Sequence, residues 1–137
     1  MDWKDCNLNK FVKKIKPDEN LIKSLILSSE NKLKSGELLK INNITASSKL
    51  SLFYDSLREI LEAISIKKGF KIYNHECFVG FLKGICHEDE FSKSFDKLRI
   101  VRNQINYYGK TFPVEDIGYL IDKTKELRSN LIKKYLK

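Results

Sequence analysis

The sequence predicts an all-α fold, an antiparallel four-helix up-and-down bundle with an additional short N-terminal helix. Apolar residues recur three and four positions apart in several long segments, which is typical of amphipathic helices. Glycine or proline stands at most of the breaks between these segments, and no segment is predicted to be a strand. A chain of 137 residues suits a single domain, so residues 1–137 are expected to share one core.

The N-terminal segment, residues 2–16, is predicted to be a short basic helix with Asp2 as its N-cap. This helix is expected either to pack on the bundle through its apolar side or to serve as a nucleic-acid-binding arm. Its apolar side is formed by Trp3, Leu8, Phe11, Val12 and Ile15, and its lysines are Lys4, Lys10, Lys13, Lys14 and Lys16.

The second helix is predicted to start after Pro17, because proline suits a first turn and the acidic residues Asp18 and Glu19 favour the positive end of the helix dipole. Its apolar period runs to Lys34, and Gly36 fits the position just past a helix end. Residues 36–43 have no period and are expected to be a connector.

The longest periodic segment, residues 44–68, is predicted to be the core helix. Its opposite side carries an acidic stripe, Asp55, Glu59 and Glu62. The stripe is either a solvated face or a source of counter-charge for Arg102 or Arg99, across the bundle or across a dimer interface.

Gly69 breaks this helix, and Asn74 is expected to cap a shorter helix that extends to Ile85. His75 would then occupy the first helical position, where a neutral imidazole is favoured. It is either a catalytic base or a surface or packing histidine. The neighbouring acidic turn at His87 is too local to predict a metal site.

Residues 91–109 are the helix around which the candidate site is organised. Its apolar arc contains Arg102, and a buried guanidinium needs a partner, so Arg102 is expected in an ion pair or on the floor of a cleft. Arg99, Asn103 and Asn106 form a polar strip beside it, suited to phosphate or base contacts. A final helix is predicted over residues 114–136.

The net charge of +8 favours polyanionic partners such as nucleic acids or nucleotides. No apolar run approaches ~18 residues and the N-terminus has no signal-peptide pattern, so a cytoplasmic protein without membrane association is expected. No glycine-rich phosphate loop is present, and no cofactor is predicted.

The three cysteines, Cys6, Cys77 and Cys86, cannot all pair within one chain, and they lack Cys-x-x-Cys spacing. Neither a disulfide framework nor a zinc site is therefore indicated, and the cysteines are expected to be reduced and mostly buried.

Several stretches together resemble an archaeal-type branch of the HEPN (higher eukaryotes and prokaryotes nucleotide-binding) domain superfamily. They are residues 23–25, 51–59, 67–77, 81–83 and 98–109, and the resemblance covers most of residues 18–136. It implies a small helical bundle that is often a homodimer. Many members of the superfamily are metal-independent ribonucleases with an Arg-x4–6-His motif, and others accompany minimal nucleotidyltransferases or act as toxins in toxin–antitoxin pairs.

Arg102 and Asn103 match the motif's arginine and the polar residue after it, but Tyr107 stands where the histidine is expected. A phenol is a poor base near pH 7, so the resemblance implies a catalytically degenerate domain that binds RNA or a nucleotide around Arg102. One alternative is an active ribonuclease in which Tyr107, with His75, replaces the histidine. Another is a protein-interaction partner of a nucleotidyltransferase.

Overall fold

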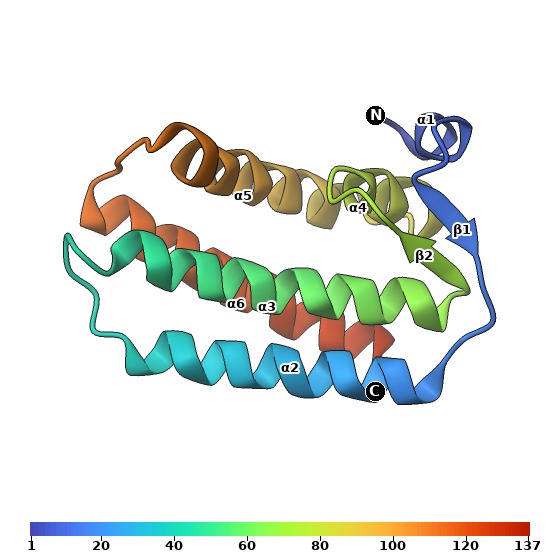
Figure 1. The fold of residues 1–137 in the computed structure, drawn as a ribbon, viewed down its shortest axis with the longest axis horizontal. Helices are drawn as coiled ribbons and strands as arrows, with labels where there is room; N and C mark the ends of the chain where they lie inside the picture. Colours follow the sequence, from blue (N-terminus) through green and yellow to red (C-terminus); the bar gives the residue numbers. More distant parts are fainter.

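The computed structural model describes residues 1–137 and is mostly helical (Figure 1). Its elements are α1 (Trp3–Leu8), β1 (Val12–Lys14), α2 (Glu19–Leu38), α3 (Ala46–Lys67), β2 (Phe70–Ile72), α4 (Cys77–Gly80), the π-helix η1 (Phe81–Ile85), α5 (Asp89–Tyr108) and α6 (Val114–Tyr135). No helix is long and apolar enough to cross a membrane. The prediction that the chain is mostly helical is confirmed.

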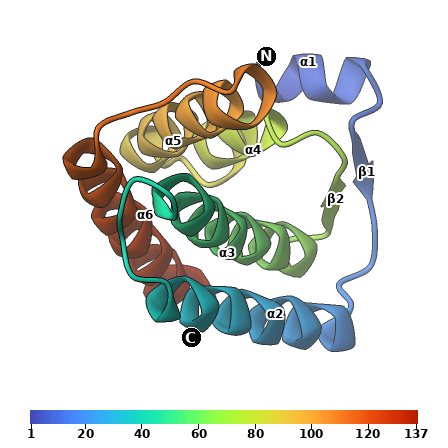
Figure 2. The same cartoon turned by 60° about the vertical axis from the view of Figure 1, so that its left-hand side comes forward.

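Helix α3 is the centre of the fold, with α2, α5 and α6 packed around it (Figure 2). Consecutive long helices run in opposite directions across Figure 1. The main core is formed by the buried face of α3 together with apolar residues of α4, η1, α5 and α6. The bounds of α3 match the predicted helix over residues 44–68 closely, because a regular apolar period is a local signal in the sequence.

The prediction of a helix over residues 2–16 is wrong after Leu8. Asp2 caps α1 as expected, accepting a hydrogen bond from the Asp5 amide, but the helix ends at Leu8 with Asn9 as its C-cap, and Lys10 has a φ of 59°. The chain then pairs antiparallel with β2, Val12 opposite Ile72 and Lys14 opposite Phe70. The prediction that the chain has no strands is therefore also wrong. The pairing was not visible in the sequence because the partner of β1 lies about 60 residues away.

Gly36 does not follow the end of a helix. Helix α2 continues to Leu38, and Gly36 lies inside it against the ring of Phe53. A Cβ atom on Gly36 would lie 2.9 Å from a ring carbon of Phe53. The glycine therefore serves close packing between α2 and α3, which the sequence alone does not distinguish from a stop signal.

The short helix predicted after Asn74 begins later than expected. The Asn74 side chain accepts a hydrogen bond from the Glu76 amide at 2.9 Å, which organises a turn, and α4 starts only at Cys77. From Phe81 to Ile85 the backbone is a π-helix. His75 therefore lies in the turn before α4 and does not occupy a first helical position.

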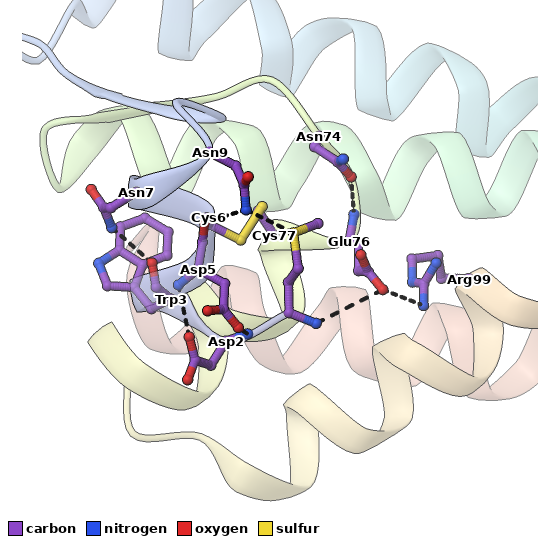
Figure 3. Close-up of a disulfide and its surroundings, with 11 residues drawn as sticks. Asp2, Trp3, Asp5, Cys6, Asn7, Asn9, Asn74, Glu76, Cys77 and Arg99 are labelled. Carbon is purple, nitrogen blue, oxygen red and sulfur yellow. Dashed lines mark hydrogen bonds and ion pairs between the residues drawn. A yellow bond between two sulfur atoms is a disulfide. The ribbon is translucent and has the colours of Figure 1, made fainter.

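The prediction of three reduced cysteines is wrong. Cys6 of α1 and Cys77 of α4 form a disulfide, and both are fully buried (Figure 3). Only Cys86 is a free thiol. Trp3 of α1 packs so closely on α4 that a Cβ atom on Gly80 would lie 2.8 Å from the Trp3 backbone nitrogen. This packing and the β1–β2 pairing bring together two cysteines that are 71 residues apart.

Candidate functional site

A polar groove of about 310 Å³ lies between α5 and the turn that connects β2 to α4. It brings together every site residue predicted from the sequence except Asn106. Asn106 lies on the α3 side of α5, where its side-chain oxygen accepts a long hydrogen bond from Ser51 at 3.5 Å. The lining residues are Tyr73, Asn74, His75, Glu76, Arg99, Arg102, Asn103 and Tyr107.

Arg102 lies at the boundary between the groove and the core, with 17% of its side chain exposed. Its guanidinium lies 5.2 Å from the centre of the Tyr54 ring, in a cation–π arrangement, and 3.8 Å from the carboxylate of Asp55. Its Nε atom is buried and has no hydrogen-bond partner. Asp55 is the single carboxylate partner of Arg102, and at 3.8 Å it leaves N–H donors of the guanidinium free for an anion in the groove.

Arg99 is held by acidic neighbours along one edge. Its Nε and Nη2 donate to the same Asp96 oxygen at 3.1 and 2.8 Å, and Nη2 lies 3.7 Å from Glu76. Glu76 also lies 4.0 Å from the N-terminal amine of Met1, and Figure 3 shows its ion pair with Arg99. The Glu76 carboxylate therefore occupies the part of the groove where an anion would meet Arg99.

The acidic stripe of α3 is not a simple solvated face. Glu59 is buried and pairs with Lys32, and Asp55 lies 3.8 Å from Arg102, so of the two alternatives for the stripe the structure supports the counter-charge for Arg102, within the chain. Asp55 also lies 3.9 Å from Arg58, and Arg58 contacts Glu62 at 3.2 Å. Arg58 was not predicted from the sequence to be part of this network, although its spacing from Asp55 and Glu62 by three and four residues was a usable signal.

His75 is half-buried, and its ring lies 6.2 Å from that of Phe78. Burial lowers the pKa of His75 below its usual value, and the positive charges of Arg58 and Arg102 lower it further. The imidazole is therefore neutral at pH 7 and able to accept a proton. Beneath the groove, burial raises the pKa of Tyr54 to about 12, so its phenol stays protonated.

We expect this depressed pKa of His75 to make stability depend on pH. Between the ordinary value near 6.5 and the lower folded value, the unfolded chain binds more protons, so the free energy of unfolding falls as pH falls through this window. His75→Asn should flatten this part of the profile, and His87→Asn is the matched control. Urea titrations at several pH values measure it; equal slopes in wild type and His75→Asn would contradict the assignment.

The turn residues Tyr73, Asn74 and Glu76 belong to the groove but were not selected from the sequence. They follow β2 and have no helical period, and their place opposite α5 results from the disulfide and the β1–β2 pairing. No group of three or more His, Cys, Asp or Glu side chains is placed to hold a metal ion. No family model, curated protein or solved structure matches this chain.

Proposed function

We propose that the chain binds RNA or a nucleotide through phosphate contacts in the groove around Arg102. The observation that carries this proposal is the convergence of Arg99, Arg102 and Asn103 on one open groove, where the guanidinium of Arg102 has a single ion-pair partner in the protein, Asp55 at 3.8 Å. Arginine presents its donors in a planar fork that fits phosphate oxygens. The net charge of +8 adds long-range attraction for a polyanion.

The resemblance to HEPN domains supports the same proposal, since it assigns an anion-binding role to Arg102 and Asn103. On the basis of this resemblance we propose that the four long helices form an antiparallel up-and-down bundle. We also propose that the chain is a homodimer with α5 near the two-fold axis. A mass measurement by light scattering at tens of micromolar tests the dimer. Partnership with a nucleotidyltransferase stays a prediction of the resemblance alone.

Salt dependence tests the binding itself. Fluorescence anisotropy with a labelled single-stranded RNA in EDTA should show an affinity that falls as salt rises from ~50 to ~200 mM, because arginine contacts release counterions from phosphates. The Arg99→Ala variant should show a shallower dependence than wild type. Affinity that is indifferent to salt would contradict the basic groove.

Removing the charge of Glu76 should strengthen binding. The Glu76 carboxylate lies 3.7 Å from Arg99 and repels an incoming phosphate, so Glu76→Gln is expected to tighten RNA binding about two- to fivefold, the range of a partly exposed ion pair. Glu90→Gln is the control, because Glu90 is exposed on α5 and does not line the groove. Unchanged or weaker binding by Glu76→Gln would contradict this role.

A second function, metal-independent RNA cleavage, is favoured by the position of neutral His75 in the same groove. His75 would take the proton of a 2′-hydroxyl, the 2′-oxygen would attack the phosphorus, and the 5′-oxygen would leave with a proton from the Tyr107 phenol. The products are a 2′,3′-cyclic phosphate and a 5′-hydroxyl, with Arg102 stabilising the charged phosphorane. Cleavage of labelled RNA in EDTA that His75→Ala abolishes while binding persists would establish it.

A further inference from the structure

Two exposed tyrosines line the groove beside its arginines. Tyr73 lies in the turn after β2 and is 61% exposed, and Tyr107 lies in the last turn of α5 and is 70% exposed. They come from segments more than 30 residues apart in the sequence, and both line this groove. Large aromatic rings with one face in water are well suited to stacking on a planar ligand.

These two rings have no structural task within the chain. Neither forms an aromatic pair or lies under a cationic side chain, whereas Trp3, Tyr54 and Phe78 all pack against other rings. Tyr119 is as exposed as Tyr73, but Lys123 lies 5.5 Å from its ring centre, and it does not line the groove. Among the exposed tyrosines, Tyr73 and Tyr107 are the ones that line the groove together with Arg99 and Arg102.

We infer that the groove takes an unpaired nucleotide, with its base stacked on Tyr73 or Tyr107 and its phosphate held by Arg99, Arg102 and Asn103. The inference rests on the proposed function and adds the ligand class. A base inside a duplex has both faces covered by its neighbours and offers none to a tyrosine, whereas the bases of a single strand are accessible to aromatic side chains. The volume of about 310 Å³ is at the small end of ligand pockets and suits one nucleotide.

The test compares three RNA probes by anisotropy at one salt concentration: a mixed-sequence single strand, the same strand annealed to its complement, and the same strand with abasic sites. We expect the single strand to bind at least tenfold more tightly than the duplex or the abasic strand, since base–aromatic stacking typically contributes that much. Competition by free adenosine and uridine 5′-monophosphates distinguishes an isolated nucleotide from one within a strand.

Variants separate stacking from charge. Of Tyr73→Leu and Tyr107→Leu, the variant that removes the stacking ring is expected to weaken single-strand binding about tenfold or more, and both should leave duplex binding unchanged. Tyr107→Phe should bind like wild type, because the ring is kept, and Tyr119→Leu is the control for loss of an exposed tyrosine. Both groove tyrosines are exposed, so thermal melting of their variants should match wild type.

Equal affinity for single strand and duplex, or wild-type binding by both leucine variants, would overturn the inference. If Arg102→Ala weakens binding in the same assay while the leucine variants do not, phosphate binding stands and only the stacking is refuted. If Arg102→Ala also binds as wild type, the proposed function itself fails.

Discussion

Replacing Arg102 with alanine should weaken RNA binding by more than tenfold while leaving the protein folded. A charge-assisted arginine contact to phosphate is typically worth ~1.5 to 3 kcal/mol, and Arg102 is the groove arginine whose donors are least used by the protein. Anisotropy with labelled single-stranded RNA measures the loss. Arg102→Lys should recover part of the affinity, because the charge remains and the planar fork is lost.

The same substitution separates a structural role of Arg102 from a functional one. Removing one partner of a fully buried ion pair lowers the free energy of unfolding by roughly 3 to 5 kcal/mol, because the remaining carboxylate is left unpaired. Here Asp55 is 29% exposed and keeps Arg58 at 3.9 Å, so the loss is mainly the cation–π contact with Tyr54. We therefore expect Arg102→Ala to lower the free energy of unfolding by only about 1 to 2 kcal/mol.

Arg128 provides the matched control for this experiment. It is 6% exposed, it donates to Ser29 at 3.1 Å and to Glu30 at 2.9 Å, and it lies outside the groove. Arg128→Ala should therefore destabilise the fold more than Arg102→Ala, and at temperatures where it is folded it should bind RNA like wild type. An Arg102→Ala protein that unfolds as readily as Arg128→Ala, or that binds RNA undiminished, would refute this interpretation of Arg102.

Reduction of the Cys6–Cys77 disulfide should lower the free energy of unfolding by about 4 kcal/mol, the chain-entropy value for a loop of 71 residues. The crosslink restricts the unfolded chain, and reduction restores that freedom. Urea denaturation with and without a reducing agent measures the change in midpoint. The Cys77→Ala variant should match reduced wild type and be insensitive to the reducing agent.

Cys86→Ala is the control for thiol chemistry, because Cys86 is free and half-buried. Burial raises the pKa of its thiol, which keeps it protonated and unreactive at pH 7. This variant should respond to reduction as wild type does. A midpoint that does not move on reduction of wild type would show that the disulfide does not contribute to stability.

The long helices and the helix that carries the arginines were predictable from the sequence. The segment 44–68 was expected and α3 spans Ala46–Lys67, and the helix expected to end at Gly109 does end there, with Gly109 in the left-handed conformation. Asp2 and Asp18 were predicted near helix starts, and both cap a helix. These features depend on residues within a few positions of one another, where period and capping chemistry act directly.

The tertiary structure alone decided how separate segments meet. It placed His75 and Tyr73 opposite Arg102, joined Cys6 to Cys77, paired β1 with β2 and chose Asp55 as the acid that faces Arg102. Gly36 is a further example, since α2 continues past this glycine to Leu38 and the ring of Phe53 in α3 packs against it. Each of these contacts joins residues from different elements, and their free energy depends on the packing of the whole chain, which local sequence patterns do not contain.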